Sequence, residues 1–234
     1  MRLPRRPRID TDEVADRWQP RLYLRLIVLG LLYVVVATAI VQVGLAHPVF
    51  PGDRGLVVLP MFHAAVIPAA LSVLCRGGSV YVLDAFDPEQ VVDVLDGERI
   101  GVAVLVPAML QAIVSVVENV ADRRYDVLRS IYYGASPIAE STLRGAIDAF
   151  GCGFVQSYGM TEAAQALTFL TADDHRLALA SRPELLLSAG RPAAGTELQV
   201  IDGADSPLPA GTPGEIVARG PQLMSGYWRR PEAT

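Results

Sequence analysis

The chain has 234 residues, and 51% of them are hydrophobic, which suits one large domain or two small ones with a sizeable core. The formal net charge is −5 and no basic patch follows the first few residues, which excludes nucleic acid as a partner for the body of the protein. All 20 basic residues are arginine, which excludes any chemistry that needs a lysine ammonium.

The N-terminal region combines a polar, arginine-rich stretch at residues 1–25 with an uncharged apolar run at residues 26–46. The run matches the roughly 20 residues that a helix needs to cross the hydrocarbon core of a membrane. It therefore favours a transmembrane-type helix and a membrane-associated protein. A buried helix or a strand-rich run is the alternative, because Val34, Val35 and Val36 are β-branched.

Short apolar runs typical of strands then alternate with helical patterns. Strands are expected at residues 55–60, 79–83, 102–106, 128–133 and 154–158, and helices at residues 64–74, 88–98, 108–120 and 139–150. Asp87 is the expected N-cap of the second helix. This alternation predicts an α/β fold with a mainly parallel sheet and flanking helices.

Beyond Glu162 the pattern changes. Two short strands are expected at residues 197–201 and 214–219, separated by the turn-rich stretch 203–213. They predict a small antiparallel β unit after the parallel sheet.

The sharpest motif is QSYGMTE at residues 156–162, which begins in an expected strand and ends where a helix is expected to start. Ligands of open parallel sheets bind at the carboxyl ends of the strands. There Tyr158 can stack on a purine, Thr161 can hold a phosphate, and Glu162 can take Mg²⁺. The alternative is that Thr161 and Glu162 form an ordinary helix N-cap with an acidic first turn.

Two further motifs follow expected strands, YGASPI at residues 133–138 and LPMFH at residues 59–63. Gly134 and Ala135 are small enough for a flat ligand to approach the backbone. The alternative is an ordinary turn in which Ser136 caps the next helix. His63 by itself is more often structural than catalytic.

In this order and spacing, the three motifs resemble the adenylate-forming (AMP-binding) superfamily of acyl-CoA synthetases, luciferases and peptide-synthetase adenylation domains. The resemblance runs from about residue 51 to residue 234 and is greatest to bacterial fatty-acyl-CoA ligases. Supporting stretches are PGDR (51–54), RGG (76–78), FDPE (86–89), VPAML (106–110), AGRP (189–192), GEI (214–216) and GYW (226–228).

The resemblance implies a two-step reaction. ATP and a carboxylate such as a fatty acid would give an acyl-adenylate, and CoA would then take the acyl group. Gly134, Ala135 and Ser136 would line the adenine and acyl pockets, and Tyr158 would stack on the adenine.

The remaining residue roles also come from the resemblance. Thr161 would contact the AMP phosphate, and Glu162 would hold Mg²⁺, so that both would serve catalysis. Gly159 would lie beside the acyl carbon, and His63 would lie near the acyl channel.

The resemblance also implies parts that this sequence does not contain. The family's phosphate loop, which carries a lysine, is expected a few tens of residues before His63, where the arginine-rich segment stands instead. The ribose-binding aspartate and the C-terminal lid domain with its catalytic lysine are expected after Thr234. We therefore expect a membrane-type segment at residues 1–50 and, at residues 51–234, a truncated AMP-binding domain that is inactive alone.

Two alternatives remain open for the function. One is half of a split ligase that another chain completes, and the other is a membrane-anchored nucleotide-binding or scaffold module. Seven arginines precede the apolar run, and only Arg54 closely follows it, so the positive-inside rule would place the folded part outside the cytoplasm. A functional bacterial ligase needs it in the cytoplasm, where ATP and CoA are found. A new start or a shifted frame in the first ~50 residues would explain this conflict.

Overall fold

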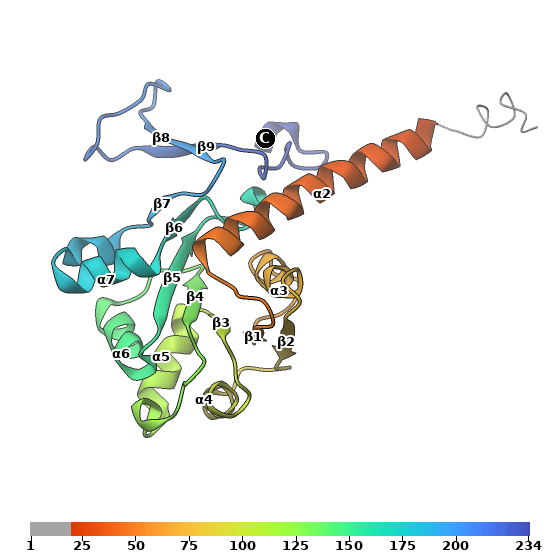
Figure 1. The fold of residues 1–234 in the computed structure, drawn as a ribbon. Helices are drawn as coiled ribbons and strands as arrows, with labels where there is room; N and C mark the ends of the chain where they lie inside the picture. Colours follow the sequence, from red (N-terminus) through yellow and green to blue (C-terminus); the bar gives the residue numbers. More distant parts are fainter. Residues whose placement is uncertain (1–19) are drawn as a thin grey trace, which may run out of the picture.

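A seven-stranded sheet lies at the centre of the computed structural model, which describes residues 20–234 (Figure 1). Its strand order is β2-β1-β3-β4-β5-β6-β7. The first five strands run parallel, which confirms the predicted α/β sheet. They are β1 (Arg54–Val57), β2 (Ser79–Val82), β3 (Val102–Leu105), β4 (Ser130–Gly134) and β5 (Gly153–Tyr158).

Helices connect these strands as the alternating pattern predicts. They are α3 (Val66–Leu74), α4 (Pro88–Gly97), α5 (Pro107–Val116) and α6 (Glu140–Phe150). Asp87 is the N-cap of α4, since its carboxylate accepts a hydrogen bond of 2.8 Å from the backbone N–H of Gln90. Pro88, which has no N–H to lose, occupies the first turn.

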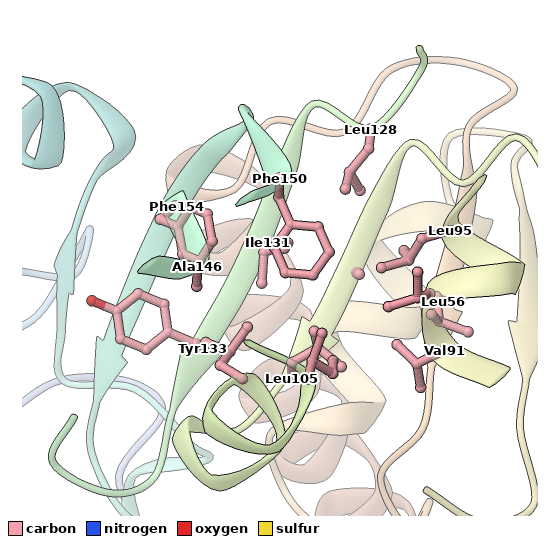
Figure 2. Packing of buried hydrophobic residues seen from close by; sticks show 14 of the residues in the cluster. Leu56, Val91, Leu95, Leu105, Leu128, Ile131, Tyr133, Ala146, Phe150 and Phe154 are labelled. Atoms are coloured by element: carbon pink, nitrogen blue, oxygen red, sulfur yellow. The ribbon is translucent and has the colours of Figure 1, made fainter. Parts of the chain in front are cut away.

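The two faces of the sheet are covered separately because alternate strand residues point in opposite directions. Leu105, Ile131 and Tyr133 pack toward α4, α5 and α6 in the larger core (Figure 2). Val104 and Tyr132, each next to one of them in sequence, pack on the opposite face with residues of α2 and α3. The strands are apolar on both faces for this reason.

The second half of the chain departs from the prediction. β6 (Thr168–Leu170), β7 (Arg191–Pro192) and the intervening α7 (Ala172–Ala180) were not expected, and both strands are antiparallel to their neighbours. Strands of two or three residues are too short to show the alternation of apolar and polar residues that predicts a strand. β8 (Glu197–Ile201) and β9 (Glu215–Arg219) form the predicted antiparallel pair.

The prediction of a transmembrane helix at residues 26–46 is wrong. Within the part of the chain that the structure describes, no helix is long and apolar enough to cross a membrane. The run does form one helix, α2 (Pro20–Ala46), and the start of this helix projects beyond the sheet (Figure 1). The predicted membrane association therefore has no support, and the arginine-rich stretch of residues 1–19 lies outside the described residues.

The last turns of α2 are instead part of the protein core. Ala39 and Val43 are buried, and Val43 packs with Ala69 of α3 and with residues of the sheet. The polar Gln42 is buried between them and donates a hydrogen bond of 2.8 Å from Nε2 to the carbonyl of Ala194. Here the apolar residues face protein and the buried amide has a protein partner.

His47, just after α2, is almost completely buried and stacks on Tyr132 with ring centroids 5.5 Å apart. Burial lowers its pKa to about 4, with a smaller contribution in the same direction from the charge of Arg129 and opposing contributions from a backbone hydrogen bond of Ser130 and the charge of Asp53. A buried neutral imidazole therefore supports the face of β4 that looks toward α2.

Replacing Val43 by alanine tests the packing of α2. The loss of two buried carbons is expected to lower the free energy of unfolding by about 2 kcal/mol. Leu45→Ala is the matched control, because Leu45 lies on the same turn but is 68% exposed, and its loss is expected to change stability by less than about 0.5 kcal/mol. Urea unfolding of both variants measures the difference. Equal effects would show that α2 does not fold with the domain.

His47 also makes stability depend on pH. Between about pH 6.5 and pH 4 the unfolded chain binds a proton at His47 that the folded chain does not, so stability falls as the pH falls. The expected contribution is about 2 kcal/mol between pH 7 and pH 5. His47→Phe keeps an aromatic ring against Tyr132 and should lose less stability over this interval. Urea unfolding at both pH values compares the two proteins, and parallel profiles would contradict the assignment.

Candidate functional site

Two of the predicted motifs lie side by side at one edge of the sheet. β4 and β5 are parallel neighbours, and Gly134 pairs with Ser157 at their carboxyl ends. The turn after Gly134 and the turn after Tyr158 therefore leave the sheet together. This is the juxtaposition that the motif order predicts.

Close packing at this edge requires glycine at two positions. A Cβ on Gly134 would lie 2.4 Å from the carbonyl oxygen of Ser157, and a Cβ on Gly159 would lie 2.2 Å from that of Gln165. Ala135, which follows Gly134, has a φ of 71°, in the left-handed region that disfavours side chains by about 1–2 kcal/mol. Such strain is concentrated at functional sites.

A cavity of about 280 Å³, here called cavity A, opens between these turns and the segment after β1. Five of the predicted site residues line it: His63, Gly134, Ala135, Gly159 and Thr161. Its other walls are mainly apolar or aromatic and include Leu59, Ala64, Ala65, Val104, Leu105, Val106, Tyr132, Tyr133 and Met160.

A second cavity of about 340 Å³, cavity B, lies on the other side of the same turns. Ser136 and Tyr158 line it, and Tyr158 is 39% exposed, so its ring is accessible to a ligand. Ala135, Ser157 and Gly159 line both cavities. These three residues form the shared wall of the two cavities.

Neither Ser136 nor Thr161 is the N-cap of a helix. The N-cap of α6 is Ala139, without a side-chain hydrogen bond, so Ser136 does not cap that helix. Thr161 and Glu162 belong to a single 3-10 turn, Thr161–Ala163, which also has no side-chain cap. Thr161 thus begins a short 3-10 turn that contains Glu162, and it also lines cavity A.

Glu162 stands next to Thr161 but does not belong to the lining of either cavity. Its Oε1 accepts a hydrogen bond of 2.6 Å from the hydroxyl of Tyr227, 65 residues away. This bond, helped by a backbone hydrogen bond, lowers the pKa of Glu162 and raises that of Tyr227. Glu162 is therefore a carboxylate held in its ionised form.

The donor set fits Mg²⁺ in one way only. No group of three or more histidine, cysteine, aspartate or glutamate residues able to hold a metal occurs in residues 20–234 as described. A single carboxylate such as Glu162 suits Mg²⁺ that arrives with a phosphate ligand, because this ion keeps several waters and takes substrate oxygens. A dedicated protein cage is not needed for that mode.

Sequence reasoning missed the polar floor of cavity A. The hydroxyl of Tyr132 donates a hydrogen bond of 3.2 Å to Oε1 of Gln165, and both residues are buried. Burial raises the pKa of Tyr132 to about 12. Gln165 has a φ of 104°, and no sequence pattern predicts this conformation.

The chain is similar to known enzymes in sequence. The family model described as AMP-binding enzyme matches residues 30–228, a range that begins inside α2. The feruloyl-CoA synthase of Amycolatopsis sp is 38% identical over 185 residues, covering 78% of this chain and 35% of that protein. The medium/long-chain-fatty-acid–CoA ligase FadD8 of Mycobacterium tuberculosis is 35% identical, covering 77% and 30%. The chain thus spans about a third of the length of these curated relatives.

Solved structures agree with the sequence relatives. The inhibitor-bound N-terminal domain of FACL13 from Mycobacterium tuberculosis is similar with a TM-score of 0.74 and 29% identity, over 86% of this chain and 48% of that one. The amide bond synthetase McbA from Marinactinospora thermotolerans is similar with a TM-score of 0.75 and 29% identity, over 85% and 39%.

Gly134→Ala tests the close approach of β4 and β5. The added methyl group must push the strand ends apart, which is expected to cost about 1–3 kcal/mol of stability. Gly145→Ala in α6 is the control, because its Cβ would meet no atom within 4 Å, and it is expected to stabilise the helix by about 0.5–1 kcal/mol. Denaturant unfolding measures both. Gly134→Ala with unchanged stability would mean that the strand ends are not packed as described.

Proposed function

Because the chain belongs to the AMP-binding enzyme family and forms an acyl-CoA-ligase-like domain, we propose that cavity B takes the adenine of ATP and cavity A takes the acyl group of a carboxylate. The observation that carries this proposal is the wall shared by the two cavities. A ligand in cavity A and a ligand in cavity B would come together beside Ala135, Ser157 and Gly159.

Recognition of adenine rests on Tyr158 and the turn after β4. The half-exposed ring of Tyr158 offers a stacking surface, and Ala135 and Ser136 line the same cavity. The glycine at position 134 lets this turn lie against β5, which brings the backbone near a flat ring. Stacking on an aromatic ring suits a purine because every base has a π-face.

The reacting atoms would meet next to Thr161, which lines cavity A beside Gly159. An oxygen of the carboxylate attacks the α-phosphorus of ATP, and pyrophosphate leaves to give the acyl-adenylate. The thiol of CoA would then lose its proton to solvent, its sulfur would attack the acyl carbonyl carbon, and AMP would leave. The Thr161 hydroxyl can donate to a phosphate oxygen in both steps, and Glu162 would hold Mg²⁺, which supplies charge neutralisation to the phosphates.

The acyl group is bounded by the walls of cavity A. These walls are apolar and aromatic apart from His63, Thr161, Ser157 and the Tyr132–Gln165 pair. Such a lining suits an aromatic or aliphatic carboxylate, in agreement with the feruloyl and fatty-acid substrates that name the relatives. His63 lines cavity A, is exposed and lies against Phe62, which supports the proposed position near the acyl group.

These 234 residues by themselves are not expected to complete the reaction. The sequence contains no lysine, and neither cavity is lined by an arginine, aspartate or glutamate among the described residues. Phosphoryl chemistry depends almost entirely on positioning and charge stabilisation, and one lost stabilising group costs about 10²–10³-fold in rate. Arginine does not replace a lysine simply, because its fork is planar and bulky while the ammonium is a compact point charge.

Nucleotide binding and turnover are therefore expected to separate. Calorimetry should detect binding of AMP that weakens roughly 10-fold in Tyr158→Ala, since stacking on a base is worth about 1–3 kcal/mol. Tyr33→Ala on α2 is the control, because Tyr33 is 74% exposed and distant in sequence from both motifs. Pyrophosphate release from ATP with ferulate or a fatty acid should stay at background. Release that disappears in Glu162→Ala would contradict the expected inactivity, and absence of AMP binding would contradict the nucleotide site.

A further inference from the structure

Glu162 is held by a segment that comes from a distant part of the chain. The backbone N–H of Met224 donates a hydrogen bond of 2.8 Å to the carbonyl oxygen of Glu162, and the hydroxyl of Tyr227 donates one of 2.6 Å to its carboxylate. One bond fixes the main chain of Glu162 and the other fixes its side chain. The residues from the end of β9 to Tyr227, here called the 220–227 segment, therefore contact both the main chain and the side chain of Glu162.

The 220–227 segment is anchored in turn by a buried amide. Gln222 is 1% exposed, and its Nε2 donates a hydrogen bond of 2.6 Å to Oγ1 of Thr196. The same Oγ1 accepts a hydrogen bond of 3.2 Å from Nε2 of Gln42 in α2. Thr196 thus joins α2 to the segment that carries Met224 and Tyr227, with all three polar side chains buried.

We propose that Tyr227 is a positioning residue for the metal-binding carboxylate: its hydroxyl orients Glu162 so that the free oxygen positions face a nucleotide-bound divalent cation. This inference rests on the proposed function, because it takes Glu162 as the Mg²⁺ ligand. It adds a residue that reaches the metal only through Glu162.

The chemistry of the carboxylate supports this role. A carboxylate offers about four lone-pair positions on two oxygens, and the Tyr227 hydroxyl occupies one of them. In the described part of the chain no other side chain donates a hydrogen bond to this carboxylate, so it keeps positions for a cation. A hydrogen bond from a neutral donor keeps the charge of the carboxylate, restricts its rotation and favours the ionised form that a cation needs. Glu162 and Tyr227 are both partly exposed, so without this bond the carboxylate would sample other rotamers.

Tyr227→Phe removes only the hydroxyl and tests the proposal. Calorimetric titrations of the full chain with ATP at increasing Mg²⁺ give the Mg²⁺ concentration of half-maximal effect, and AMP binding in EDTA gives the metal-free affinity. Loss of a hydrogen-bonded partner of a metal ligand typically costs 10–100-fold in metal affinity. Tyr227→Phe is therefore expected to raise the Mg²⁺ midpoint about 10-fold and to leave metal-free AMP binding within about twofold.

Two further variants complete the design. Tyr33→Phe makes the same chemical change at an exposed tyrosine of α2 and should leave the midpoint unchanged. In Glu162→Gln, which keeps an oxygen for Tyr227 but loses the charge, adding Tyr227→Phe should have no further effect on the Mg²⁺ dependence.

The outcomes separate this inference from the function on which it rests. If the wild-type chain binds neither ATP nor AMP, the proposed function fails and the positioning role fails with it. If the wild-type chain binds ATP with a Mg²⁺ dependence that Glu162→Gln removes and Tyr227→Phe leaves unchanged, the function stands and the inference is overturned. If Tyr227→Phe weakens metal-free AMP binding by the same factor, Tyr227 has a general structural role and the inference is also overturned.

Discussion

The close approach of β4 and β5 at Gly134 and Ser157 is the constraint on which the candidate site depends. Parallel pairing carries the two turns off the sheet at the same level, and the missing side chain at Gly134 lets them lie against each other. Both cavities share the wall that results, so in the proposed function a nucleotide on one side and an acyl group on the other would be brought together by backbone geometry. Ala135 adopts its left-handed conformation at this point, and the strand pairing around it holds the residue in that strained conformation.

Much of the sheet could be predicted because its signals are local. Apolar runs of strand length between Gly55 and Tyr158 alternate with helical patterns, and the cap at Asp87 marks a helix start within a few residues. The same reasoning failed for α2, since a uniformly apolar run has no polar face that tells lipid from protein. The burial of Gln42 depends on Ala194 and Thr196, which lie about 150 positions later in the sequence. β6, β7 and α7 were missed because two very short strands carry no period, although Thr171 and Asp174 form a capping box that could have located α7.

The candidate site also has a part that local sequence predicts and a part that it does not. The motifs at residues 133–138 and 156–162 could be placed at adjacent strand ends from their order alone, and the turns meet there. The contacts of Glu162 could not be predicted, because Tyr227 approaches from beyond β9 through a segment whose position is set by Gln222 and Thr196. Local pattern therefore locates the edge of the sheet where the two turns meet, whereas the orientation of the Glu162 carboxylate is a property of the assembled tertiary structure.

The distribution of charge limits how such a site can act. Shape and stacking suffice for an adenine ring or an acyl chain, and the uncharged linings of cavities A and B, as far as the structure describes them, supply these. Phosphates need positive charge, yet the charged group nearest in sequence to Thr161 is the carboxylate of Glu162, which can favour phosphates only through a cation. In the proposed function, the placement of Mg²⁺ on the phosphates would therefore depend on the orientation of that one carboxylate. Tyr227 and the main chain of Met224 hold Glu162, so in the proposed function the anchoring of the 220–227 segment to Thr196 and α2 would serve the chemistry as well as the fold.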